Sequence, residues 1–369
     1  MPNEPPNLPW YRIPSSNTGS TCNVYMMQAG ALALPKDLVL LPGPNEPNLS
    51  LDSGSKDGER EMFLVPDFVF LIEHPATGDR YFFDLGMRKD LENSTPAVVR
   101  DTLPNFENFS ESPVDILKEY GTTEQQPSVV KAVIFSHLHF DHIGDAGKVG
   151  FSKAEMWLGP STCTTARPGY PTDKESAVFS DDLPKDGSKK IVEFTLPSSL
   201  LDDKRKMAIK DALLNGNYQG IERHEPAGGW FGLGAFESVF DLFGDGSAYV
   251  IDAPGHMAGH QMLLVRVKIG SGVEADDFVL LAGDCFHHPA MLGDPLLTAR
   301  PPFSMSSMHG DPETAINTMF RTKRCAEEVY IWVVGAHDFS VRAAISPNTD
   351  AVEGLVLLTD WREKGWKRQ

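Results

Sequence analysis

The chain has 369 residues, of which 41% are hydrophobic, and a formal net charge of −18 at pH 7. This composition supports a substantial core, whereas the acidic excess argues against binding to phosphate backbones, which require a basic surface. No apolar run approaches the roughly 20 residues of a membrane helix, so we expect neither a nucleic-acid partner nor a membrane partner.

The compartment can be predicted from the first residues and from the cysteines. Residues 1–6, Met-Pro-Asn-Glu-Pro-Pro, lack the basic and then apolar segments of a secretory signal. The four cysteines are scattered without a pairing pattern, as is typical of a reducing compartment. We therefore expect a cytoplasmic protein, and the sequence indicates no oligomeric state.

The domain organisation follows from composition and from the spread of the motifs described below. Residues 1–18 are rich in Pro, Asn and Ser, which predicts a loose N-terminal arm. Residues 19–369 should form a single domain, because the motifs extend from Asp84 to His337 and require one continuous fold. We expect a long insertion at about residues 160–240, next to the site.

Regular elements are predicted along the whole chain. Apolar runs predict early strands at residues 23–29, 68–72 and 81–84. Amphipathic spacing predicts helices at residues 114–120, 203–214 and 312–328. Asp311 and Pro312 have the residue types of an N-cap and a first helical residue. This loose alternation of strands and helices indicates an α/β protein.

The most informative stretch is Ser-His-Leu-His-Phe-Asp-His at residues 136–142, directly after an apolar strand. Its metal-binding side chains are His137, His139, Asp141 and His142. The first two histidines share a face of the chain, because alternate strand residues point the same way, and can hold one ion. The last two fall in the following turn and can begin a second site. Three histidines in six positions could also form a basic loop, but the spacing favours two neighbouring cations.

Three later strands also end in side chains that can bind a metal. A β-rich run at 248–253 breaks at Pro-Gly and delivers a histidine on a turn, and apolar strands at 278–282 and 329–334 end at a glycine. The side chains delivered there are His256, Asp284 and His337. The earlier strand at 81–84 ends in Asp84. The chain therefore brings several candidate ligands to strand ends.

These motifs, in this order, resemble those of the metallo-β-lactamase superfamily, and the resemblance covers about residues 20–345. Residues 253–265, Ala-Pro-Gly-His-Met-Ala-Gly-His-Gln-Met-Leu-Leu-Val, are most similar to the branch of N-acyl homoserine lactone lactonases. That branch includes fungal relatives that open the γ-lactam ring of benzoxazolinones. The resemblance implies a four-layer αββα sandwich with the metals at the edge where the strand ends converge.

The resemblance also implies a ligand set. One metal would be held by His137, His139 and His256, the other by Asp141, His142 and His337, with Asp284 between them. Asp84 would orient a ligand histidine by accepting its other ring proton, although it could simply be a turn acid. Imidazoles and carboxylates without a thiolate suit two Zn²⁺ ions, and Mn²⁺, Co²⁺ or Fe²⁺ are also chemically admissible.

Such a site predicts hydrolysis of a small molecule. Two cations would share a water and lower its pKa toward about 7, so that a bridging hydroxide would be available as the nucleophile toward a carbonyl. Asp141 is the natural proton carrier to the leaving group. We expect the substrate to be a cyclic ester or a cyclic amide, such as an acyl homoserine lactone or a benzoxazolinone, and the sequence does not choose between them.

Two features bear on how the substrate is bound. The lactonases resembled here carry a tyrosine three residues after the bridging aspartate, where this chain has His287. We expect His287 to replace that hydrogen-bond donor, or else to be a partly exposed loop histidine. Trp230 and Phe231 lie among glycines and should line an apolar substrate pocket, or else pack in the core.

Two other activities of the same fold are also compatible with these motifs. One is an iron-dependent oxidoreductase of the sulfur dioxygenase kind; flavodiiron proteins are disfavoured, because they usually place a carboxylate where His139 stands. The other is a glutathione thioester hydrolase, for which the sequence shows no clear basic cluster that would bind the glutathione anion.

Overall fold

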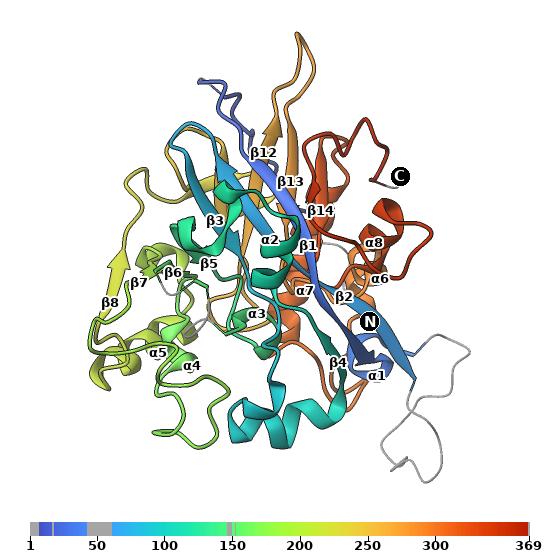
Figure 1. Cartoon of the computed structure of the whole chain (residues 1–369). Helices are drawn as coiled ribbons and strands as arrows, with labels where there is room; N and C mark the ends of the chain where they lie inside the picture. The colour runs from blue at the N-terminus through green and yellow to red at the C-terminus, as the bar shows by residue number, and fades with distance from the viewer. Residues whose placement is uncertain (1–6, 17, 43–60, 146–149, 152, 368–369) are drawn as a thin grey trace.

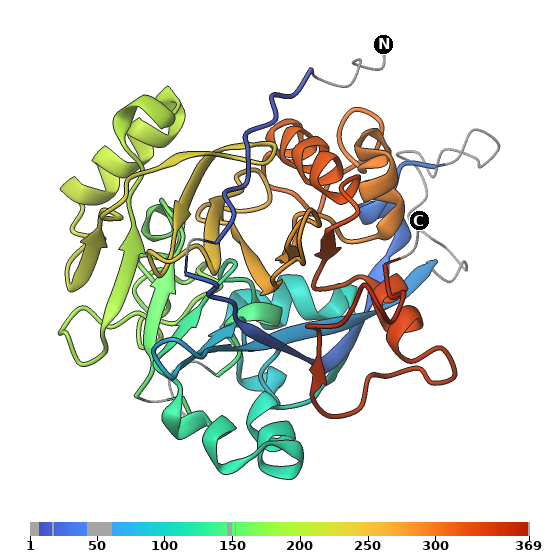
Figure 2. The same cartoon turned by 90° about the horizontal axis from the view of Figure 1, so that it is seen from above.

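The computed structural model describes residues 7–16, 18–42, 61–145, 150–151 and 153–367. Two β-sheets pack face to face, with α2 outside the first sheet and α7 outside the second (Figures 1 and 2). This arrangement confirms the predicted αββα sandwich of the metallo-β-lactamase fold. None of the described helices is long and apolar enough to cross a bilayer.

The first sheet has the strand order β15-β1-β2-β3-β5-β6-β7-β8, with β4 paired to β1. Its strands are β1 (Asn23–Pro35), β2 (Met62–His74), β3 (Asp79–Phe83), β4 (Glu107–Ser110), β5 (Ala132–Ile134), β6 (Glu155–Leu158), β7 (Ile191–Phe194), β8 (Ile221–His224) and β15 (Val356–Leu357). The strands from β3 to β8 in this order run parallel. Their carboxyl ends therefore meet at one edge of the sheet.

The second sheet has the order β14-β13-β12-β11-β10-β9. Its strands are β9 (Phe231–Leu233), β10 (Phe236–Asp241), β11 (Ala248–Asp252), β12 (Gln261–Lys268), β13 (Asp277–Leu281) and β14 (Ile331–Val334). β13 and β14 are parallel, with Leu281 opposite Val334. The turns after these two strands consequently lie next to each other.

Helices cover the outer faces of the sheets and connect the strands. They are α1 (Lys36–Val39), α2 (Pro113–Tyr120), α3 (Phe140–Ile143), α4 (Cys163–Ala166), α5 (Asp203–Leu214), α6 (Pro289–Gly293), α7 (Pro312–Ala326) and α8 (Phe339–Ile345). α7 begins as predicted, because the side chain of Asp311 accepts from the backbone N–H of Thr314. It ends at Ala326, two residues earlier than the sequence suggested.

The core explains why β2 is almost continuously apolar. Phe68 and Phe70 pack between the two sheets, whereas Val69 and Leu71 face the helical layer that contains Leu117 of α2. A strand buried on both faces needs apolar side chains at every position. One acidic residue, Asp67, interrupts this run and is completely buried.

β1 is longer than the predicted strand at 23–29. It continues to Pro35 through a register shift between Gln28 and Ala31. Gly30 lies in this irregularity at φ 134°, and a Cβ there would lie 2.2 Å from the carbonyl oxygen of Phe109. The irregularity therefore depends on a residue without a side chain.

Of the predicted N-terminal arm, residues 1–6 and 17 lie outside the described residues. Tyr11 exchanges two backbone hydrogen bonds with Gly234, of 2.7 and 2.9 Å. The guanidinium of Arg324 lies 4.3 Å from the ring centroid of Trp10. The division into an arm and a single domain stays a prediction.

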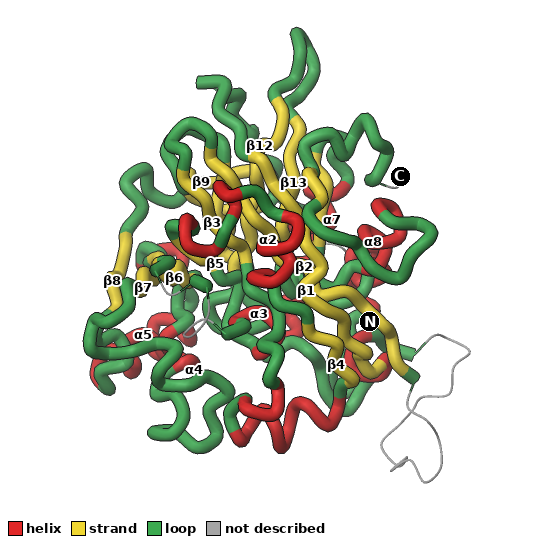
Figure 3. The backbone as a smooth tube through the Cα atoms, in the orientation of Figure 1, coloured by secondary structure: helices red, strands yellow, loops and turns green. Residues whose placement is uncertain are grey.

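The segment at about 160–240 adds β7 and β8 to the first sheet and carries α4 and α5; between β6 and β7 the chain is mostly loop (Figure 3). Arg205 of α5 fixes this segment to the second sheet. Its guanidinium makes two hydrogen bonds, of 2.7 and 3.0 Å, to the carboxylate of Asp252 at the end of β11. The segment is thus attached to the strand that precedes His256.

Candidate metal centre

The predicted ligands meet where the strand ends of the two sheets face each other. β5 ends just before His137, β13 before Asp284 and β14 before His337. The first turn of α3 carries Asp141 and His142, which lie after the strand end as expected. Parallel pairing within each sheet brings these segments, distant in sequence, to one place.

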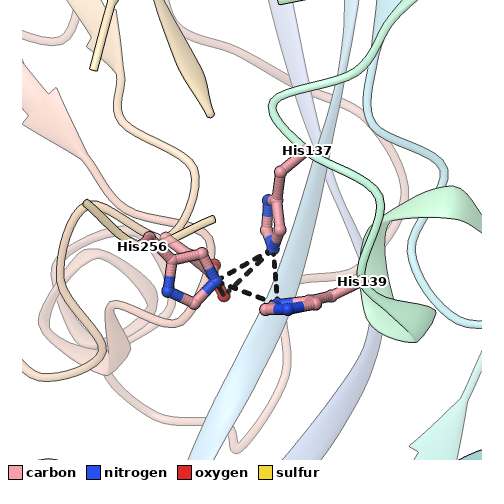
Figure 4. A group of neighbouring side chains, drawn as sticks. His137, His139 and His256 are labelled. Atoms are coloured by element: carbon pink, nitrogen blue, oxygen red, sulfur yellow. Dashed lines mark hydrogen bonds and ion pairs between the residues drawn. The ribbon is translucent and has the colours of Figure 1, made fainter. Parts of the chain in front are cut away.

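Three imidazoles form the first half of the site and point toward one another (Figure 4). Nε2 of His137 lies 2.9 Å from Nδ1 of His139, and Nε2 of His256 lies 3.1 and 2.9 Å from those two atoms. Burial and the neighbouring imidazoles hold the pKa values of His137 and His256 well below the usual range. Both rings are therefore neutral and offer lone pairs, as metal ligands must.

The second half contains Asp141, His142, Asp284 and His337, all buried. Oδ1 of Asp284 lies 3.0 Å from Nε2 of His142 and 3.2 Å from Nε2 of His337. Apart from these contacts with one another, the three atoms have no hydrogen-bond partner among the described residues. Buried polar atoms that converge without a partner fit a bound cation.

Asp284 joins the two halves through its two oxygens. While Oδ1 faces the second group, Oδ2 lies 3.7 Å from Nε2 of His137 and 3.4 Å from Nε2 of His256. Burial alone would raise the pKa of Asp284, yet the imidazoles of His142 and His337 hold it well below the usual range. The side chain is therefore an ionised carboxylate that can bridge two cations.

The charge pattern of the second half differs from that of the first. Burial lowers the pKa of His142, but the carboxylates of Asp284 and Asp84 outweigh it and raise that pKa well above its usual value. The pKa of His337 is also raised, because Asp284 and Asp141 outweigh burial. In the metal-free protein protons compensate these carboxylates, and divalent cations would displace the protons.

Most of the ligand histidines are held through the ring nitrogen that faces away from the metal position. Nδ1 of His142 lies 2.8 Å from Oδ2 of Asp84, and Nδ1 of His337 lies 2.9 Å from the carbonyl oxygen of Pro66. Asp84 also accepts from the backbone N–H and hydroxyl of Ser136. Such partners fix the tautomer and leave Nε2 free for a metal.

His256 is held in the same way by a residue that sequence reasoning left unassigned. Its Nδ1 lies 3.3 Å from Nδ1 of His309. The backbone N–H groups of Gly310 and Asp311 donate to the carbonyls of His256 and Gly255, so this segment is fastened to the turn. His309 precedes a helix rather than ending a strand, and no local pattern signals its position.

The turn between β11 and β12 depends on Gly255 and His260. A Cβ on Gly255, at φ 123°, would lie 2.2 Å from the backbone nitrogen of Ala315 in α7. Nδ1 of His260 lies 2.9 Å from the carbonyl of Ala253, and Nε2 accepts from the backbone N–H of Asp284. His260 therefore holds this turn by hydrogen bonding.

His287 lies inside the site. Only 1% of it is exposed, so the alternative of a partly exposed loop histidine is wrong. Its Nε2 lies 3.1 Å from Oδ2 of Asp284, and its Nδ1 is buried without a partner among the described residues. The adjacent His288 instead caps α6, where its Nδ1 accepts from the backbone N–H of Ala290.

Trp230 and Phe231 are not brought together with the ligands. Nε1 of Trp230 donates to the carbonyl of Thr195, and its ring packs against Phe240 with centroids 4.9 Å apart. Phe231 begins β9 and packs against the core that lies next to α7. These contacts are those of core packing, and the role in a substrate pocket stays a prediction.

The comparison with protein families agrees with this geometry. Residues 108–153, which include the His-x-His-x-Asp-His stretch, match the family described as the Metallo-beta-lactamase superfamily. This match confirms the expected resemblance to the metallo-β-lactamase superfamily. The expected likeness to its lactonase and γ-lactamase branch is also confirmed.

The proteins to which this chain is similar include fungal ones. The cytochrome P450 monooxygenase mpaDE of Penicillium roqueforti (strain FM164) is 28% identical over 83% of this chain and 33% of its own length. The γ-lactamase FDB1 of Fusarium pseudograminearum (strain CS3096) is 30% identical over 62% of this chain and 47% of its own length. The metallo-hydrolase mfmC of Annulohypoxylon moriforme is 27% identical over 62% of this chain and 50% of its own length. The chain thus spans a third to a half of the length of these relatives.

Solved structures show the same fold. A variant of AiiA from B. thuringiensis with N-decanoyl-L-homoserine bound at the active site has a TM-score of 0.55 and 17% identity, covering 91% of this chain and 100% of that one. An N-acyl homoserine lactone hydrolase with N-hexanoyl-L-homoserine at its catalytic metal centre has a TM-score of 0.54 and 17% identity, covering 91% of this chain and 100% of that one.

Proposed function

We propose that this protein is a metal-dependent hydrolase that opens a small cyclic ester or cyclic amide, that is, a lactone or a γ-lactam. The observation that carries this proposal is the pair of ligand groups joined by the two oxygens of Asp284. The lactonase and γ-lactamase names among the related proteins support the substrate class.

The donor set suits two Zn²⁺ ions, and Mn²⁺, Co²⁺ or Fe²⁺ would also fit imidazole and carboxylate ligands. When bound, two such cations would polarise the substrate carbonyl and make a shared water acidic enough to ionise near neutral pH. His137, His139 and His256 would hold one ion, and Asp141, His142 and His337 the other. The cysteines lie outside both groups of candidate ligands in the described chain.

Asp141 is the proposed proton carrier. Interaction with His337 outweighs burial and lowers the pKa of Asp141, so this carboxylate is ionised and can accept a proton. One of its oxygens lies 3.5 Å from Nε2 of His337, and this proximity to the second ligand group supports the role. Because an amide nitrogen must be protonated before it leaves, this role matters more for a lactam than for a lactone.

His287 is the proposed substrate hydrogen-bond donor. Its Nε2 already faces Asp284, so a contact to the substrate carbonyl would use Nδ1, which has no partner among the described residues. The location supports this role, since the ring centroid lies 5.0 Å from that of His256.

The test is a screen of the purified protein against homoserine lactones, benzoxazolinones, β-lactams, thioesters and phosphodiesters, with metal content measured in parallel. We expect hydrolysis of a lactone or a γ-lactam, abolished in His142→Ala. Turnover of thioesters alone would favour the glutathione thioester hydrolase instead. Oxygen consumption with iron bound, and no ring opening, would favour the oxidoreductase.

A further inference from the structure

Asp67 is a buried acid that the proposed chemistry does not use. It lies in β2, among apolar residues, with 0% of its surface exposed. Both of its carboxylate oxygens lack a hydrogen-bond partner among the described residues. A buried carboxylate without a partner is costly, so its retention needs an explanation.

The backbone on both sides of Asp67 is hydrogen-bonded to the turn that carries His337. The carbonyl of Pro66 accepts from Nδ1 of His337 at 2.9 Å, and the backbone N–H of Phe68 donates to the carbonyl of Ala336 at 3.0 Å. On its other side Asp67 packs against Gly86, where an added Cβ would lie 3.2 Å from Oδ2 of Asp67. Asp67 is therefore held rigidly beside the second half of the metal centre.

The charges that act on Asp67 belong to the metal centre. Burial raises the pKa of Asp67 to about 8, and the carboxylates of Asp141 and Asp284 add to this rise. The imidazoles of His337 and His142 act in the opposite direction. Asp67 nevertheless lies outside the group of ligand atoms within 4.8 Å of one another, which contains Asp141, His142, Asp284 and His337.

We propose that Asp67 is an outer carboxylate of the metal centre, which binds neither ion directly but strengthens binding of the second cation. This rests on the proposed two-metal function. Two divalent cations bring four positive charges, and Asp84, Asp141 and Asp284 supply three negative charges. With neutral imidazoles, and before any water or substrate is counted, Asp67 supplies the fourth and makes the buried centre neutral.

This role couples metal binding to stability. In the metal-free protein burial outweighs the attraction of the His337 and His142 imidazoles, so the ionised Asp67 carboxylate opposes folding, whereas in the loaded protein the metal ions would attract it. Asp67→Asn should therefore stabilise the metal-free protein and destabilise the metal-loaded protein. A purely structural side chain would affect both forms alike.

The experiment is a zinc titration of metal-free wild type and Asp67→Asn against a chromophoric chelator, together with thermal melts of both forms. We expect the first equivalent to bind equally well and the second to bind about tenfold more weakly in the variant. The metal-free variant should melt at a higher temperature than metal-free wild type, and zinc should raise its Tm by less. Equal dissociation constants, or equal Tm shifts in both forms, would overturn the proposal.

Glu193→Gln is the matched control, because Glu193 is also a buried acid but accepts from the backbone N–H groups of Ser161 and Cys163 instead of facing the metal centre. It should leave both zinc affinities unchanged. Asp67→Ser repeats the measurement if the asparagine variant does not fold. Wild type that binds fewer than two equivalents would contradict the two-metal function itself, whereas failure of the variant effect alone would contradict only the role of Asp67.

Discussion

Oδ2 of Asp84 lies 2.8 Å from Nδ1 of His142, and the same carboxylate accepts two hydrogen bonds from Ser136. One acid at the end of β3 thus fixes both the end of β5 and the orientation of a ligand in α3. Asp84 does so at φ 62°, a conformation that asparagine and aspartate tolerate better than most residues.

Asp84→Asn tests this relationship without disturbing the backbone. The loss of the carboxylate charge should weaken metal binding by about 10- to 100-fold, because the ligand imidazole loses its orienting partner. Isothermal titration of the metal-free protein measures the change. Asp245→Asn is the control, since it alters a similar contact, 2.9 Å from Nε2 of the buried His74, away from the metal centre. Unchanged affinity in Asp84→Asn would contradict the role of Asp84.

His309→Phe removes the acceptor for Nδ1 of His256. We expect binding at the first metal position to weaken by about tenfold, because His256 is then free to rotate or change tautomer. The ligand-field spectrum of the Co²⁺-substituted protein reports the change directly. His309→Gln keeps an acceptor and should retain more of the affinity; identical spectra for wild type and His309→Phe would show that His309 does not position His256.

His287→Phe tests the proposed substrate donor. Loss of such a donor typically costs about 2.7 to 4 kcal/mol, so kcat/KM should fall by about 10²- to 10³-fold. Steady-state kinetics on the substrate identified in the screen measure this. His288→Asn, at the cap of α6, should retain most of the activity. An unchanged kcat/KM in His287→Phe would refute the donor role.

The stability of the metal-free protein should depend on pH through Asp67. Folding raises the pKa of Asp67 from 3.8 to about 8. The contribution of Asp67 to the free energy of unfolding is therefore fully present below pH 3.8 and is lost as the pH rises toward 8. Urea unfolding of wild type and Asp67→Asn from pH 4 to 8 measures the difference. The wild type should lose stability relative to the variant over this range, and parallel curves would contradict the buried, unpaired carboxylate.

The convergence of the candidate ligand side chains could be predicted because most of them follow strand ends. His137, His256, Asp284 and His337 follow apolar runs that are easy to recognise, and the parallel pairing of β13 with β14 brings the last two together. The full length of β1 was missed, because an irregularity at Gly30 interrupts its pattern.

Asp67 and His309 could not be assigned from the sequence. One lies within an apolar strand and the other precedes a helix, so their closeness to the ligands depends on tertiary packing between segments far apart in the chain. The glycine-rich surroundings of Trp230 suggested a pocket. Its contacts with Thr195 and Phe240 are those of packing, and the pocket role stays a prediction.

The most direct test of the central claim is the metal content of the purified protein, measured together with hydrolysis of lactones and γ-lactams before and after exhaustive chelation. Two ions per chain are expected, with turnover lost on their removal and restored by zinc. Full turnover by protein shown to contain no metal would contradict the assignment of these imidazoles and carboxylates to a two-cation centre.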